Sequence, residues 1–263
     1  EDAERDLADF ALIKAAYEFR GYKKGARSIY MRLLHQVPPV VMNLKKIRRL
    51  MKKYGLFCPF RRENPYRRMA QMMKTSHVAP NVVNRCFKPS VPRHILLTDI
   101  TYLFYRGGVC YLSTILDACT HEELAYQVSV SLQVDFVLET VDMLCEKYGA
   151  ELDNETIVHS DQGCHYTSNA FISKLKDAEF VQSMSRRGNC WDNAPQESFF
   201  GHMKDEIVGI LAELHTFEEV RATVDDWMDY YNNDRYQWEL EKLSPVEYKQ
   251  YLDTGCYPLT RGI

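Results

Sequence analysis

The sequence predicts a mixed α/β domain that follows a small, basic, all-α domain. Before residue 60, apolar side chains recur at helical spacing, whereas after Pro92 β-branched runs alternate with helical segments. Charge is divided at the same place: residues 1–94 carry 21 Lys+Arg against 7 Asp+Glu, a net of +14, although the whole chain has a net charge of -3. This asymmetry indicates a polyanion-binding part joined to an acidic body.

The acidic part has the pattern of a five-stranded sheet flanked by helices. The first two strands are separated by a Gly107-Gly108 turn, and the last two alternate with helices. Three successive antiparallel strands followed by alternating helices and strands favour a mixed sheet. The predicted strands cover residues 94–105, 109–116, 123–130, 156–159 and 180–184, and the predicted helices cover residues 134–147, 168–176 and, with breaks, 193–231.

Three helices are predicted in the basic part, over residues 7–19, 26–36 and 44–54, with Asn43 as the N-cap of the third. A helix, a break and a basic helix are typical of a helix-turn-helix, whose second helix can lie in the major groove. A plain solvated surface is the alternative interpretation. The cations of the third helix predict phosphate contact rather than sequence specificity. They are Lys45, Lys46, Arg48, Arg49, Lys52 and Lys53.

Composition argues against several classes of protein. No apolar run approaches the roughly 18 residues of a membrane span, and the acidic start lacks the apolar stretch of a secretory signal. The eight cysteines include no C-x-x-C pair at zinc-ligand spacing, so we expect reduced thiols rather than a structural zinc site. We therefore expect a cytoplasmic protein without a membrane partner.

Three carboxylates stand in positions suited to chemistry. Asp99 lies inside an apolar strand, where a charge is costly unless it is paired or bound to metal. Asp161 directly follows the fourth strand, a place where α/β sheets hold their sites. Glu197 lies in a helix opened by Pro195, which suits a first helical turn. Each acid alone is more typical of a cap or a surface charge.

Together with their neighbours these acids resemble a known family. The segments TDITYL, IVHSDQGCHYTS and SMSRRGNCWDNAPQESFFGHMKDE are similar to those of the integrase-core (DDE) transposases of bacterial insertion sequences. In that family the transposase is often split over two reading frames. Thirty-five residues separate Asp161 from Glu197, as expected there. The likeness continues through TFEEV and YYNNDRYQWELEKLSPVEY, and upstream into RRLMKKYGL, so nearly the whole chain is covered.

The resemblance implies a ribonuclease H-like fold in which Asp99, Asp161 and Glu197 hold two Mg²⁺ ions, for which Mn²⁺ can substitute. Hard Mg²⁺ requires carboxylate oxygens rather than thiolate or imidazole. Two such ions would support Mg²⁺-dependent cleavage at the ends of an insertion sequence, followed by strand transfer by the 3′-OH. The implied location is the bacterial cytoplasm, at the nucleoid.

Further site residues follow from the resemblance and from spacing. Lys204, two helical turns after Glu197, matches the family's contact to the DNA end. Asn193 lies one turn before Glu197 and either orients a carboxylate, contacts DNA or is a simple N-cap. His159 either positions a phosphate or water, or is a packed histidine. Arg186 and Arg187 precede the catalytic helix and are predicted to meet phosphate.

Four segments are predicted on this basis: a helix-turn-helix-like DNA-binding domain over residues 1–60, a basic linker over 61–92, an integrase-type catalytic core over 93–215, and a helical extension of that core over 216–263. The expected partners are the element's terminal inverted repeats, target DNA, at least one further copy of the chain and the product of an upstream frame. The alternatives are a catalytically silent DNA-binding derivative of a transposase and a nuclease for RNA:DNA hybrids.

Overall fold

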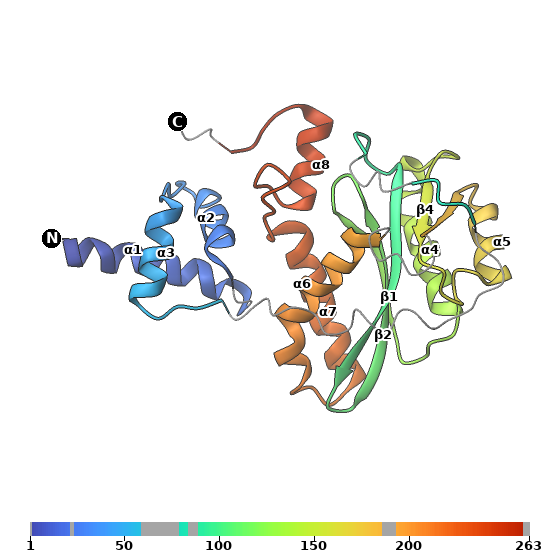
Figure 1. Ribbon diagram of the computed structural model, residues 1–263, viewed down its shortest axis with the longest axis horizontal. Helices are drawn as coiled ribbons and strands as arrows, with labels where there is room; N and C mark the ends of the chain where they lie inside the picture. The colour runs from blue at the N-terminus through green and yellow to red at the C-terminus, as the bar shows by residue number, and fades with distance from the viewer. Residues whose placement is uncertain (1, 22–23, 59–78, 84–88, 186–192, 260–263) are drawn as a thin grey trace. The chain divides into compact units, whose positions relative to one another are not determined.

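The computed structural model describes the chain except residues 1, 22–23, 59–78, 84–88, 186–192 and 260–263 (Figure 1). Backbone contacts group the chain into two compact units, one of residues 62–227 and the other of residues 1–61 with 228–263. In the part that is described, no helix combines the length and the apolar character needed to cross a membrane.

The larger unit is built on a mixed five-stranded sheet, as the sequence predicts, and the strand order is β3-β2-β1-β4-β5. The first three strands pair antiparallel, while β1–β4 and β4–β5 are parallel. Every strand lies within two residues of its predicted bounds. The strands are β1 (Ile95–Tyr105), β2 (Gly108–Asp117), β3 (Glu123–Ser129), β4 (Ile157–Ser160) and β5 (Val181–Met184).

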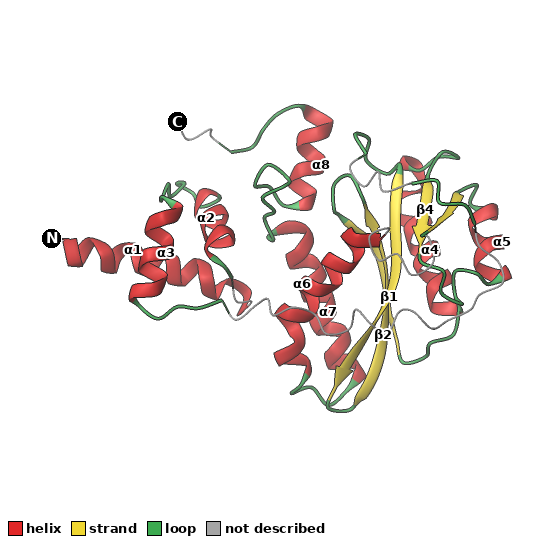
Figure 2. Ribbon diagram, viewed as in Figure 1, coloured by secondary structure: helices red, strands yellow, loops and turns green. Residues whose placement is uncertain are grey.

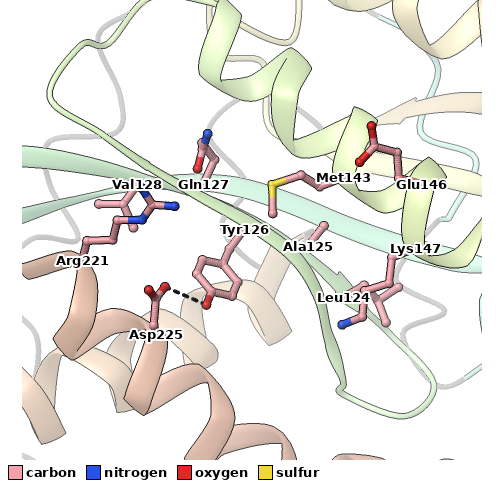
Figure 3. Close-up of a pocket in the computed structure, with 10 residues that line it drawn as sticks. All are labelled: Leu124, Ala125, Tyr126, Gln127, Val128, Met143, Glu146, Lys147, Arg221 and Asp225. Atoms are coloured by element: carbon pink, nitrogen blue, oxygen red, sulfur yellow. Dashed lines mark hydrogen bonds between the residues drawn. The ribbon is translucent and has the colours of Figure 1, made fainter. Parts of the chain in front are cut away.

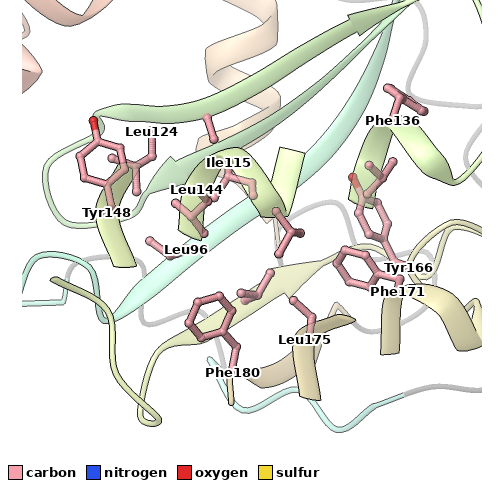
Figure 4. Close-up of a cluster of buried hydrophobic side chains, with 14 of the residues drawn as sticks. Leu96, Ile115, Leu124, Phe136, Leu144, Tyr148, Tyr166, Phe171, Leu175 and Phe180 are labelled. Carbon is pink, nitrogen blue, oxygen red and sulfur yellow. The ribbon is translucent and has the colours of Figure 1, made fainter. Parts of the chain in front are cut away.

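Helices cover both faces of this sheet. The helices α4 (Asp135–Tyr148) and α5 (Asn169–Asp177) lie on one face and α6 (Ala194–Leu211) on the other (Figure 2). A short 3₁₀ turn, η3 (Gly149–Glu151), follows α4. Because side chains alternate along a strand, Leu96 faces α4 whereas Leu97 faces the opposite side. The core on the α4 side is shown in Figure 4 and includes Leu96, Ile115, Phe136, Leu144, Tyr166, Phe171 and Leu175.

A buried ion cluster joins three elements at the start of β1. Arg93 is only 5% exposed, and its guanidinium donates to Asp117 Oδ2 at 3.2 Å and to Glu122 Oε2 at 2.9 Å. The same guanidinium lies 4.6 Å from the centre of the Tyr148 ring, whose hydroxyl donates to Glu122. Arg93 thereby fastens the β2–β3 turn and the end of α4 to the start of β1.

The smaller unit contains the three predicted N-terminal helices and the end of the chain. The helices α1 (Asp2–Glu18), α2 (Ala26–Leu34) and α3 (Leu44–Lys53), with a 3₁₀ turn η1 (Phe19–Gly21), enclose their own core. Asn43 caps α3 by accepting a hydrogen bond from Lys45 N at 2.8 Å, which confirms its predicted role. The core side chains are Ile13, Ala16, Ile29, Leu33, Met42, Ile47, Leu50 and Met51.

The end of the chain packs on α2 within this unit. After α7 (Phe217–Asn233), a loop leads to α8 (Pro245–Thr254), which starts with a capping box between Ser244 and Glu247. Arg32 of α2 pairs with Asp234 at 3.0 Å.

The four segments expected from the sequence stay a prediction, and most of the predicted linker lies outside the described residues.

We predict that Arg93→Ala lowers the free energy of unfolding by about 3–5 kcal/mol, because it leaves Asp117 and Glu122 buried without their cation. Urea unfolding followed by circular dichroism measures this loss. The exposed Arg106, changed to Ala in the same way, provides the control and should cost less than about 0.5 kcal/mol. Equal losses in the two variants would contradict the role given to Arg93.

Candidate active site

Asp99 lies in the middle of β1, half-buried, on the face of the sheet that α6 covers. Its Oδ1 accepts a hydrogen bond from Ile100 N at 2.7 Å. Burial raises the pKa of Asp99 well above its ordinary value, and the negative charges of Asp161 and Glu197 raise it further. The Ile100 N–H and the Lys204 ammonium act in the opposite direction. Ionisation of Asp99 is therefore opposed both by burial and by two acidic neighbours.

Asp161 is brought to Asp99 by the parallel pairing of β1 and β4. Leu97 is in register with His159, and each strand places its acid two residues further on. The Oδ1 of Asp161 accepts from Gly163 N at 2.8 Å. A Cβ on Gly163 would lie 2.9 Å from that same oxygen, so a larger residue at this position would displace the Asp161 carboxylate. Partial desolvation raises the pKa of the Asp161 carboxyl, although the Gly163 N–H and His165 lower it.

Glu197 comes from the first turn of α6. Asn193, the residue before that helix, is 5% exposed, and its Nδ2 donates to Asp99 Oδ2 at 3.3 Å. Glu197 follows four residues later and therefore lies on the same side of the helix. Its effect on the pKa of Asp99 agrees with this placement. Pro195 occupies the first turn, as predicted.

The three acids are neighbours but do not form a closed ligand set. Among the described residues, no three His, Cys, Asp or Glu side chains lie close enough to hold one metal ion. Asp161 and Glu197 are exposed, while Asp99 is half-buried beneath them. The arrangement is thus a group of oxygen donors in which one acid is half-buried and two are exposed.

Lys204 lies on α6 seven residues after Glu197, on the same side of the helix. Its side chain reaches solvent, and desolvation lowers its pKa, while the negative charge of Asp99 partly restores it. The interaction with Asp99 places a cation beside the carboxylates. Arg186 and Arg187, the other predicted cations near the site, lie outside the described residues.

His159 is fully buried in β4, on the same side of the strand as Asp161. Its Nδ1 lies 2.9 Å from Ser183 Oγ and its Nε2 lies 3.3 Å from Ser185 Oγ. Contact with two serines agrees with the interpretation of His159 as a packed histidine, the alternative to a role in catalysis. A role in positioning phosphate or water stays a prediction that this geometry does not favour.

Two polar residues beneath the carboxylates were missed by the sequence reasoning. Gln196 is fully buried in α6, and its Nε2 donates to Thr114 Oγ1 on β2. Thr114 is the register partner of Asp99. In the described part of the chain, Gln196 Oε1 and Asn193 Oδ1 are buried without a hydrogen bond. No signal in a single sequence distinguishes this glutamine from a surface glutamine.

Tyr166 is another buried neighbour of the two aspartates. It is 2% exposed, and its hydroxyl lies 3.4 Å from Thr98 Oγ1. Burial raises the pKa of Tyr166 well above its ordinary value, and the charges of Asp99 and Asp161 add to this effect. The hydroxyl therefore stays protonated beside the acids.

One pocket of the larger unit lies away from the three acids. A pocket of about 580 Å³ is lined by β3, α4 and the start of α7 (Figure 3). There the Tyr126 hydroxyl donates to Asp225 Oδ1 at 2.8 Å. None of the three acids lines this pocket. Asp161 and Glu197 are instead exposed, which suits a polymeric substrate better than a small molecule.

Comparison with known proteins identifies the family. Residues 89–190 and 197–251 each match a model described as "Integrase core domain", and residues 4–64 match an "HTH-like domain". The chain is 33% identical over 210 residues to the putative transposase InsK for insertion sequence element IS150 of Escherichia coli, which covers 79% of this chain and 71% of that protein. The chain belongs to the integrase-core transposase family. The transposase is also 33% identical over 213 residues to an uncharacterized transposase-like protein of Haemophilus influenzae, covering 80% of this chain and 94% of that one.

A solved structure agrees on the fold. The transposase is similar to a chain of the simian T-cell lymphotropic virus intasome in complex with PP2A regulatory subunit B56 gamma, with a TM-score of 0.53 and 12% identity over 84% of this chain and 71% of that chain. This likeness supports the ribonuclease H-like fold alone. Family membership makes the transposase a polynucleotidyl transferase of the DDE class that acts in DNA transposition and recombination.

We predict that the Gln196–Thr114 contact couples α6 to the sheet. Gln196→Met and Thr114→Val should each cost about 1–3 kcal/mol of unfolding free energy, because each leaves a buried polar group without its partner. The double variant removes both polar groups, so it should cost less than the two single losses together. Denaturant unfolding of the four proteins measures the coupling. Additive losses would show that the contact contributes nothing.

Proposed function

We propose that the transposase cleaves DNA at the ends of an insertion sequence and joins the released 3′-OH to target DNA, using divalent metal held by Asp99, Asp161 and Glu197. The observation that carries this proposal is the parallel register of β1 and β4, which sets Asp161 beside Asp99. The charges of Asp161 and Glu197 also raise the pKa of Asp99, in agreement with that placement. Three like charges gathered at one open surface need a cation to be ionised together.

The donor set fits magnesium. All three side chains supply hard carboxylate oxygens, and the nitrogens that donate to Asp99 are neutral amides, Ile100 N at 2.7 Å and Asn193 Nδ2 at 3.3 Å. Mn²⁺, which shares this preference for oxygen, can replace Mg²⁺. When bound, two such ions would activate the attacking oxygen and stabilise the leaving oxygen of a phosphodiester.

The chain's own residues prepare the site for DNA. Asn193 holds one oxygen of Asp99, and the Gly163 turn holds one oxygen of Asp161, which limits the rotation of both carboxylates. Glu197 and Lys204 are exposed on the same side of α6. Lys204 supplies a positive charge for a phosphate of the DNA end, beside acids that would otherwise repel it.

The N-terminal helices would bind the terminal inverted repeats. Residues 4–64 match an HTH-like domain, and α3 is exposed on its basic side. Two element ends must be brought together for joining, so we propose at least a dimer on DNA. We also propose that the protein encoded by an upstream reading frame is a partner of this chain. The proposal keeps the four domains predicted from the sequence, over residues 1–60, 61–92, 93–215 and 216–263.

We predict that Asp161→Asn reduces both cleavage and strand transfer by at least about 100-fold, because metal polarisation contributes several kcal/mol to such reactions. Its affinity for DNA should stay close to that of the wild type, since Asp161 repels phosphate. Labelled element-end DNA, incubated with and without Mg²⁺, reports nicked and joined products. Lys204→Ala should lower activity less and weaken binding of the DNA end.

The exposed Asp177 at the end of α5 provides the matched control, because Asp177→Asn removes the same charge away from the site. Near-normal cleavage by Asp161→Asn would refute the ligand assignment. A wild-type chain that binds element ends without cutting them under Mg²⁺ or Mn²⁺ would favour the alternative of a silent DNA-binding derivative.

A further inference from the structure

The six cations of α3 do not form one face. They divide into two stripes with different surroundings, although the sequence predicted that all six contact DNA. We call Lys46, Arg49 and Lys53 the paired stripe, and Lys45, Arg48 and Lys52 the open stripe. At 3.6 residues per turn, each stripe spans only about 60° of the helix circumference.

The paired stripe is bound to acids of α1. Arg49 donates from both terminal nitrogens to the two oxygens of Asp6, at 2.8 and 2.6 Å. Lys53 Nζ donates to Asp6 at 2.7 Å, and Lys46 pairs with Asp9. The hydrogen bonds from Arg49 and Lys53 hold the pKa of Asp6 far below its ordinary range. This bidentate arrangement positions α1 against α3.

The open stripe has no such acids. Within the described residues, Lys45, Arg48 and Lys52 make no ion pair, and all three are exposed. The buried residues Ile47 and Leu50 fix the rotation of α3 against its core, so this stripe is held toward solvent.

Two further cations of the same unit, Arg20 and Arg32, are also paired with carboxylates. On α2, Arg32 pairs with Asp234. Arg20, in η1, contacts Asp229 at 2.7 Å and Asp234 at 3.2 Å. Arg20 and Arg32 bind the end of the chain within the unit, so a polyanion would meet competing carboxylates at these two cations but not at the open stripe.

We infer that duplex DNA is held by its phosphates on Lys45, Arg48 and Lys52, while Lys46, Arg49 and Lys53 serve to hold α1 and make no DNA contact. The inference rests on the proposed DNA-binding function of this domain and narrows it to half of the predicted residues. A phosphate approaching Arg49 would have to displace a bidentate carboxylate and would lie beside Asp6 and Asp9, which repel it.

The test compares two triple variants of the full chain that remove the same charge, K45A/R48A/K52A and K46A/R49A/K53A. The probe is a short fluorescein-labelled DNA duplex of unrelated sequence, and its anisotropy is measured over a range of salt concentrations. The slope of log K against log salt falls by about 0.9 for each phosphate that the protein no longer neutralises. We expect a fall of about 2.7 for the open-stripe variant and no change in slope for the paired-stripe variant.

The paired-stripe variant can also lose α1, so two single variants keep the test decisive. Arg48→Ala should lower the slope by about 0.9, whereas its neighbour Arg49→Ala should leave the slope unchanged and lower only the thermal unfolding temperature. An equal fall in slope for Arg48→Ala and Arg49→Ala would overturn the division. A slope for the open-stripe variant equal to that of the wild type would also overturn the division. A wild-type chain that shows no salt-dependent binding would instead refute the proposed DNA-binding function.

Discussion

The repulsion between Asp99 and Asp161 is the constraint around which the larger unit is organised. The two residues are distant in sequence, and the parallel pairing of β4 with β1 places them side by side. Burial of the Asp99 carboxyl and the charge of Asp161 both raise the pKa of Asp99 and so oppose its ionisation. In the proposed function a bound cation would offset this repulsion, so the strand register would set where the metal binds.

Several neutral contacts keep the acids in place without neutralising them. Asn193 donates to Asp99, the Gly163 N–H donates to Asp161, and Gln196 ties the first turn of α6 to β2. Amides orient a carboxylate at little cost to its charge, whereas a lysine or arginine in direct contact would compete with a metal ion. The strong ion cluster of this unit, around Arg93, lies at the start of β1 and stabilises the sheet away from the acids.

The elements and the acids were predictable because they depend on local pattern. The strand bounds, the Asn43 cap and the position of Asp161 after β4 follow from periodicity, turn residues and capping chemistry, and the resemblance to the transposase family grouped the acids. The contacts of Gln196 with Thr114 and of Arg49 with Asp6 join elements that are distant in sequence. They depend on packing and rotamers, which the pattern of a single sequence does not predict. For the same reason, spacing left both interpretations of His159 open.

Counting charges therefore overstates how much of the chain attracts DNA. The 21 Lys+Arg of residues 1–94 include cations that are already bound to Asp6, Asp9 and the end of the chain, and residues 95–263 carry 29 Asp+Glu against 12 Lys+Arg. A phosphate backbone brought to this acidic body needs local positive charge at the site, which Lys204 and bound metal would supply. In the proposed function, binding and chemistry therefore depend on different charges. The open stripe of α3 would attract phosphate over a Debye length of about 8 Å, and the carboxylates would need Lys204 and bound metal to offset their repulsion of a phosphate.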